Sequence, residues 1–148
     1  MRRPVRYSPL MADEAVRLCS ACCTPREKRI VWVLLDTGLR LAELAALSKG
    51  DIDLRRSCLY AGTLPDRRAI PLSARIEPLL ASWFEEHDSL GLSARSIQRI
   101  IKDVGARAGL KGVGAEVLRH TFAVTKANAE TPPVGVAAFA WIQEPLRD

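Results

Sequence analysis

The amino-acid sequence predicts a mainly α-helical domain with one small antiparallel β-sheet, an α+β arrangement. Apolar residues recur at the helical spacing i, i+3 and i+4 through most of the 148 residues. Residues 52–72 differ, because they hold short β-compatible pieces around a turn rich in Gly, Pro and Asp at residues 62–66. With 48% hydrophobic residues and no internal linker, the whole chain 1–148 is expected to form a single domain.

Capping residues predict the bounds of the first two helices. Ser8 and Pro9 have the character of an N-cap and a first helical residue, and the helix they begin is expected to end at about Cys23. The TPRE segment at residues 24–27 is a capping box with proline at the first helical position. It predicts a second helix, which should end at Gly38.

The later elements follow from the same signals. A short helix is expected over residues 41–47, and strands over residues 58–60 and 69–70 are expected to form a small sheet or hairpin. Further helices are expected in four places: from Ser73 past Phe84, with Pro78 in the early turns, from Ser93 to near Gly109, from about residue 115 to 128, and over residues 134–142.

The composition excludes several classes of protein. No apolar run approaches the ~20 residues of a membrane span, and charges interrupt the amino-terminal segment, so neither a membrane protein nor a secreted one is expected. Cys19, Cys22 and Cys23 have helical spacing and Cys58 falls in a predicted strand, which favours buried, reduced thiols. The two histidines are isolated, so we expect no metal and no cofactor, and a cytoplasmic location.

Positive charge is concentrated in the first half of the chain. The net charge is +5, and residues 1–74 carry 13 Lys and Arg against 8 Asp and Glu, whereas the remainder carries nine of each. This asymmetry makes a polyanionic partner plausible, although a solvated basic face is the alternative interpretation.

Two short motifs indicate what that partner is. The segment TGLRLAEL at residues 37–44 resembles the first arginine box of the tyrosine recombinases, or phage integrases, and LRHTFA at residues 118–123 resembles the second. The acidic pair around Ile52, the strand over residues 68–72 and the helix after Ser93 all fall between the boxes where that family has its equivalents. The resemblance covers nearly the whole chain and implies the family's catalytic-domain fold.

The resemblance implies that Arg40 and Arg119 lie around one phosphate of double-stranded DNA. Transesterification at a DNA phosphate puts extra negative charge on the non-bridging oxygens in the transition state. Guanidinium groups can bind such oxygens bidentately. Glu43, one turn after Arg40, is expected either to orient that arginine or only to balance local charge. Taken without its motif, Arg40 would be interpreted as an ordinary exposed helix arginine.

Other positions complete the predicted site. His120 matches the family's arginine-histidine pair, with a hydrogen-bonded structural histidine as the alternative. Trp141 matches the tryptophan variant of the third box, with core packing as the alternative. The predicted catalytic residues are Arg40, Arg119, His120 and Trp141, and the predicted DNA contacts are Arg40, Arg67, Arg68 and Arg119.

Three departures from the family pattern predict binding without cleavage. The hairpin turn, residues 62–68, has no lysine to act as general acid, and Glu116 stands where the family has a histidine. The nucleophilic tyrosine is expected about two and a half helical turns beyond Trp141, where this chain has none. Its two tyrosines, Tyr7 and Tyr60, fall before the first helix and in the sheet.

The sequence leaves several interpretations open. The chain is interpreted as a catalytically inactive DNA-binding domain, which would be a truncated integrase, a decayed remnant of a mobile element or a regulator. One alternative is a fragment of an active recombinase whose tyrosine lies on a missing tail or on a partner chain. Another is a helical interaction module with no nucleic-acid role. Self-association on DNA is a further expectation from the resemblance.

Overall fold

The computed structural model describes residues 8–130, and it has the predicted mixture of helices with a small antiparallel sheet. The predicted helix over residues 134–142, with Trp141, lies outside the described residues. Within residues 8–130, no helix is long and apolar enough to cross a membrane. The elements are α1 (Ala12–Ala21), α2 (Pro25–Thr37), α3 (Leu41–Ala45), the 3-10 helix η1 (Lys49–Asp51), β1 (Ile52–Asp53), β2 (Cys58–Ala61), β3 (Arg68–Pro71), α4 (Glu77–Glu86), α5 (Ala94–Arg107) and α6 (Ala115–Glu130).

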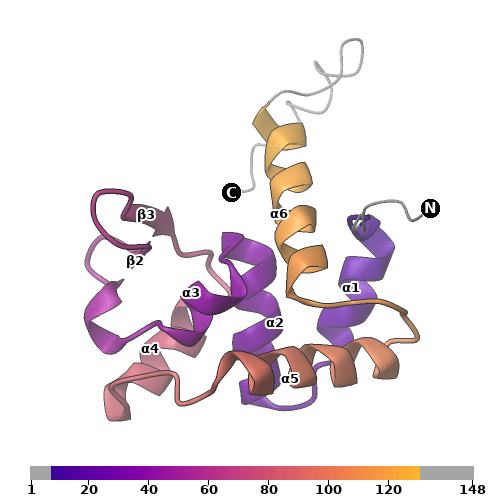
Figure 1. Cartoon of the computed structure of the whole chain (residues 1–148), viewed down its shortest axis with the longest axis horizontal. Helices are drawn as coiled ribbons and strands as arrows, with labels where there is room; N and C mark the ends of the chain where they lie inside the picture. Colours follow the sequence, from indigo (N-terminus) through magenta and orange to yellow (C-terminus); the bar gives the residue numbers. More distant parts are fainter. Residues whose placement is uncertain (1–7, 131–148) are drawn as a thin grey trace, which may run out of the picture.

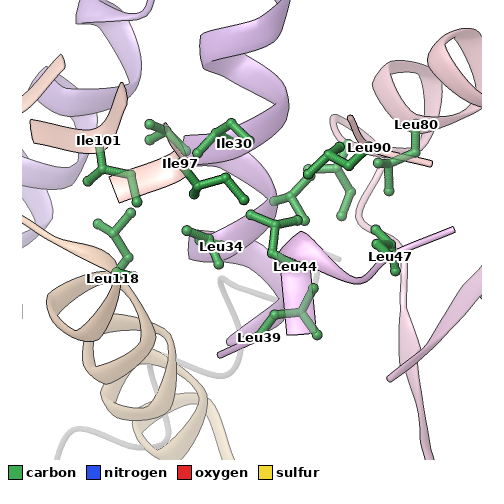
Figure 2. Close-up of a cluster of buried hydrophobic side chains, with 14 of the residues drawn as sticks. Ile30, Leu34, Leu39, Leu44, Leu47, Leu80, Leu90, Ile97, Ile101 and Leu118 are labelled. Carbon is green, nitrogen blue, oxygen red and sulfur yellow. The ribbon is translucent and has the colours of Figure 1, made fainter. Parts of the chain in front are cut away.

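The helices pack around α2, which lies at the centre of the molecule (Figure 1). Helix α5 crosses the base, α6 rises beside α2, and the β2–β3 hairpin stands on the other side of α3. Figure 2 shows Ile30 and Leu34 of α2 among buried side chains from the other elements, including Leu44, Ile97 and Leu118. One continuous apolar core therefore connects α2 to the elements on both sides of it.

The sheet has the order β1-β2-β3, and all of its pairings are antiparallel. Leu59 pairs with Ile70 across β2 and β3, and both side chains are buried, whereas Tyr60 pairs with the exposed Ala69. Because buried and more exposed side chains alternate along the two strands, one face of the hairpin packs against the core. Strand β1 has only two residues, too few for a periodic pattern to reveal in the sequence.

The predicted start of the first helix is wrong. Ser8 is not the N-cap, because α1 begins after Met11, whose backbone N–H donates to the Glu14 carboxylate at 2.8 Å. Leu10, directly before Met11, is instead bound to α6, because its backbone N–H donates to the Thr121 hydroxyl at 2.9 Å. A long-range hydrogen bond therefore outweighs the local capping signal.

Ser73 begins a turn and does not directly cap α4. Its carbonyl accepts from the backbone N–H of Ile76, and its hydroxyl donates to the Asp36 carboxylate at 2.6 Å. Helix α4 begins four residues later at Glu77, and Pro78 is its second residue. A proline there costs no hydrogen bond, because the first N–H groups of a helix have no partner within it. The other predicted caps, Thr24 and Ser93, accept from the backbone as expected.

The prediction of buried thiols holds only in part. Cys22 is buried, Cys19 and Cys58 are half-buried, and Cys23 is exposed. Burial raises the pKa of the Cys22 thiol to about 12. All four cysteines are free, and residues 8–130 hold no group of three or more His, Cys, Asp or Glu side chains suited to a metal ion.

Helix α2 ends at a glycine that a larger residue cannot replace without strain. Gly38 has a φ of +70°, and a Cβ atom there would overlap the ring of Phe122, with Phe122 Cε2 at 2.8 Å. Leu39 directly after it is fully buried, and Arg40 then becomes the N-cap of α3. The close approach of Gly38 and Phe122 therefore fixes the start of α3 relative to α6.

Gly38→Ala should lower the free energy of unfolding by about 2–5 kcal/mol, measured by urea denaturation. About 1–2 kcal/mol is the cost of a left-handed alanine, and the overlap with Phe122 adds about 1–3 kcal/mol. Gly91→Ala is the matched control, because Gly91 has a φ of +77° but no atom within 4 Å of its Cβ position. Equal losses in the two variants would contradict the role of the Phe122 contact.

Candidate nucleic-acid interface

A cavity of about 1040 Å³ opens between α6, the carboxyl end of α2 and strand β3. In Figure 1 this region lies between the β2–β3 hairpin and α6. The basic side chains that line it are Arg40, Arg68, Arg119 and Lys126, together with His120. Residues from both predicted motifs and from the hairpin thus meet in one place, although the two motifs are about eighty residues apart.

Arg40 enters the cavity from the N-cap position directly before α3. Its backbone N–H donates to the Glu43 carboxylate at 2.9 Å, and its guanidinium Nη1 lies 3.4 Å from the same carboxylate. The side chain remains 56% exposed, so the guanidinium is free to reach an anion in solution. Glu43 therefore orients Arg40 as well as balancing its charge, the two alternatives that the sequence left open.

Glu43 also binds Arg68, from the edge of the hairpin, through two hydrogen bonds of 2.9 Å. Such a bidentate pair is shorter and stronger than a neutral hydrogen bond. Hydrogen bonds from Arg68 lower the pKa of Glu43 to about 2, and only 14% of the Glu43 side chain is exposed. One carboxylate thus holds two arginines side by side at the cavity wall.

Helix α6 presents one face to the cavity and another to the core. Arg119 and His120 line the cavity, whereas Leu118 and Thr121 are buried. His120 is exposed, and within residues 8–130 its ring makes no hydrogen bond of the kind that the alternative of a hydrogen-bonded structural histidine requires. The carboxylate of Glu116, one turn earlier and also lining the cavity, lies 4.0 Å from Arg119 Nη1.

An ion pair at the wall of the cavity joins α2 to the segment after β3. Asp36 accepts hydrogen bonds from Ser73 at 2.6 Å and from Nε and Nη2 of Arg75 at 2.8 Å. The Arg75 guanidinium also lies 5.0 Å from the centroid of the Trp32 ring. Asp36 and Ser73 line the cavity, so this cluster shapes its wall. No local pattern pointed to it, because Asp36 and Arg75 are 39 residues apart.

Not every predicted DNA-contact residue reaches the cavity. Arg67 donates to Asp51 at 2.8 Å and to the Gly62 carbonyl at 3.3 Å, and it is absent from the cavity lining. Arg67 lies directly before β3, and its bonds to Asp51 and Gly62 hold its guanidinium away from the cavity that Arg68 lines. Tyr60 also lies outside the lining, with its hydroxyl 3.5 Å from Asp53. Lys126 lines the cavity but was not predicted.

The site suits a polyanion. Three guanidinium groups converge on an open cavity, and they keep their charge at any physiological pH. Backbone phosphates are the natural ligands for planar donors that bind bidentately. The fold and the site define a helical domain of the tyrosine recombinase catalytic type, with its two arginine motifs in one cavity.

The comparisons with known proteins agree with this class. Residues 9–140 match the sequence model of the phage integrase family, so this chain belongs to that family. Tyrosine recombinase XerC of Xanthomonas axonopodis pv. citri is 32% identical in an alignment 132 positions long, which covers 77% of this chain and 43% of the relative. Tyrosine recombinase XerC of Roseiflexus castenholzii is 28% identical, over 85% of this chain and 48% of the relative. The chain thus spans about half the length of these curated relatives.

Solved structures show the same fold. A crystal structure of XerA recombinase matches with a TM-score of 0.74 at 31% identity, over 87% of this chain and 53% of that one. The integrase of mycobacterium phage Brujita has a TM-score of 0.76 at 22% identity, over 88% and 47%. Lambda integrase, in a crystal structure bound to DNA, has a TM-score of 0.69 at 20% identity, over 88% and 54%.

Glu43→Gln should reduce the decrease in the free energy of unfolding that the protein shows as the pH falls. The pKa of Glu43 is lower in the folded chain than its ordinary value near 4.5, so its contribution is present above about pH 5. That contribution is lost as the pH falls toward 2, when the carboxyl is protonated and releases Arg68. Urea unfolding between pH 2 and 7 should therefore show a shallower slope in the variant.

The control is Glu86→Gln, which removes an exposed carboxylate at the end of α4 for which no ion pair is found within residues 8–130. The control should keep the pH slope of the original protein. An unchanged slope in Glu43→Gln would mean that the pair with Arg68 contributes nothing to stability.

Proposed function

We propose that this chain binds the backbone of double-stranded DNA in the cavity between α6 and the hairpin. The observation that carries the proposal is the meeting of Arg40, Arg68 and Arg119 in one open cavity. Arg40 and Arg119 stand at the positions of the family's two arginine boxes. The same fold occurs in lambda integrase, whose crystal structure includes DNA.

A phosphate would be held from two sides. Arg40 approaches from the start of α3 and Arg119 from α6, so two planar donors can engage its non-bridging oxygens. Arg68 adds positive potential at the wall, although its guanidinium is already paired with Glu43. His120 lines the same cavity, and a ring N–H of its imidazole can donate to the same group. These contacts bind the backbone and carry no base-specific information.

Glu116 weakens this site. Its carboxylate lines the cavity 4.0 Å from Arg119, where it competes with a phosphate for the guanidinium. The hairpin segment over residues 62–68 supplies no lysine to protonate a leaving oxygen, and an arginine hardly ever gives up its proton. The chain by itself is therefore a DNA-binding domain that does not cleave, related to site-specific recombination through its family.

A second candidate is a piece of an active tyrosine recombinase whose nucleophile is supplied from elsewhere. The observation that favours it is the coverage of the relatives, since this chain matches 43–48% of their length. An interaction module without a nucleic-acid role is the third candidate, and salt-dependent DNA binding would exclude it. A cytoplasmic location, based on four free cysteines, and self-association on DNA are parts of the proposal.

Arg40→Ala and Arg119→Ala should each weaken binding to a duplex by about 1–3 kcal/mol, roughly 5- to 150-fold. Each substitution removes a charge-assisted contact to a phosphate. The measurement is a gel-shift titration at two salt concentrations, in which the affinity of the original chain should fall steeply as salt rises.

The matched control is Arg99→Ala, which removes the same charge from an exposed position on α5, at the base of the molecule (Figure 1). It should change affinity less than twofold. Glu116→His should strengthen binding, because it replaces repulsion with a donor. If both cavity variants keep full affinity and a native melting curve, or if the original chain gives no shift at low salt, the proposed function is wrong.

The chain should form no covalent adduct with DNA. Cleavage needs an oxygen nucleophile in line with the phosphate, and Tyr60 lies outside the cavity lining. The missing general acid would lower the rate by a further factor on the order of 10²–10⁴. The test incubates the protein with a nicked suicide duplex and looks for a slower, DNA-linked band after denaturation. A band that disappears in Tyr7→Phe or Tyr60→Phe would show a working enzyme.

A further inference from the structure

One carboxylate of the cavity is only loosely held by its surroundings. Glu116 is the second residue of α6, its side chain is 52% exposed, and its carboxylate lies 4.0 Å from Arg119 Nη1. By contrast, Glu43 accepts two hydrogen bonds of 2.9 Å from Arg68. An exposed ion pair contributes little to stability, so the charge of Glu116 is free to respond to an anion that enters the cavity.

Other charged groups share the cavity with Glu116. The basic side chains in the lining are Arg40, Arg68, Arg119, His120 and Lys126, and the other acidic ones are Asp36 and Asp66. No residue of α1, α4 or α5 belongs to the lining within residues 8–130. Asp36 already accepts hydrogen bonds from Arg75. An experiment must therefore separate Glu116 from His120 and from Asp66.

A phosphate at Arg119 would compete with the Glu116 carboxylate. The ionised carboxylate is favoured by two positive groups, the Arg119 guanidinium and the amino end of α6, where the helix dipole is positive. A phosphate that binds the same guanidinium takes up part of that stabilisation and brings its own negative charge close to the carboxylate. Like charges at short range disfavour the ionised form of a carboxyl group and move its titration to higher pH.

We propose that this chain takes up a proton at Glu116 when it binds DNA, so that its affinity for DNA rises as the pH falls. The inference rests on the proposed DNA binding and adds a means of regulation to that site. Protonation removes the repulsion and releases Arg119, so the protonated chain binds a phosphate more tightly. By linkage, the bound phosphate favours proton uptake to the same extent.

The experiment measures the affinity of the full chain for a short duplex between pH 5 and pH 8 at constant ionic strength. His120 also gains charge as the pH falls, so the chains are compared with and without His120→Gln. In His120→Gln, affinity should rise about 3- to 20-fold from pH 8 to pH 5, as expected when a like charge moves the titration of a carboxyl group by about one to two units.

Adding Glu116→Gln to that background should abolish this rise and tighten binding about 10- to 100-fold at pH 8, because the repulsion is absent at every pH. Glu116→Ala, which also removes the carboxylate, should show the same loss of pH dependence. Calorimetry in two buffers with different heats of ionisation measures the protons taken up directly. Near pH 6 the original chain should take up a fraction of a proton that Glu116→Gln does not.

The matched control is Glu86→Gln, because Glu86 is exposed at the end of α4 and does not line the cavity. It should keep the pH dependence of the original chain, as should Asp66→Asn. If Glu116→Gln binds DNA with the full pH dependence and proton uptake, the inference is wrong while DNA binding stands. If Asp66→Asn removes them instead, the proton binds elsewhere and the inference is overturned. If the original chain binds no duplex at any pH, the proposed function itself fails.

Discussion

The two arginine motifs can act together only because α2 and α6 approach closely at one point. The ring of Phe122 packs directly against Gly38, where the Cβ atom of any larger residue would overlap it. Phe122 lies one turn beyond Arg119 in α6. The same glycine turns the chain out of α2, so that Arg40 follows two residues later at the start of α3. The geometry of the cavity thus depends on a contact that involves neither arginine.

Carboxylates pair with the arginines in and around this cavity and neutralise part of their charge. Glu43 holds Arg68 through two hydrogen bonds and lies 3.4 Å from the exposed Arg40 guanidinium, and Asp36 holds Arg75. Holding a guanidinium in place before an anion arrives reduces the entropy lost on binding, although it also neutralises part of the charge. Glu116 has no such positioning role, since it is 52% exposed and 4.0 Å from Arg119.

The family relation and the site together suggest how this chain differs from its relatives. The chain belongs to the phage integrase family and carries both arginine motifs, and its hairpin turn over residues 62–68 contains no lysine. Binding of a backbone phosphate and protonation of a leaving oxygen are separate tasks with separate residues. A site can therefore bind a phosphate without a residue that protonates a leaving oxygen, and the function proposed for this chain needs only the first task.

The sequence by itself determined the element types, the caps Thr24 and Ser93 and the family, because these depend on local periodicity, capping chemistry and short motifs. It also identified Arg40, Arg68, Arg119 and His120, which do line one cavity, whereas Arg67 binds Asp51 and does not line it. Only the tertiary structure decided that α1 begins after Met11, that Glu43 joins two arginines, and that Asp36 binds Arg75. These contacts join residues up to 111 positions apart, as between Leu10 and Thr121, and no local pattern in a single sequence encodes a pairing over that distance.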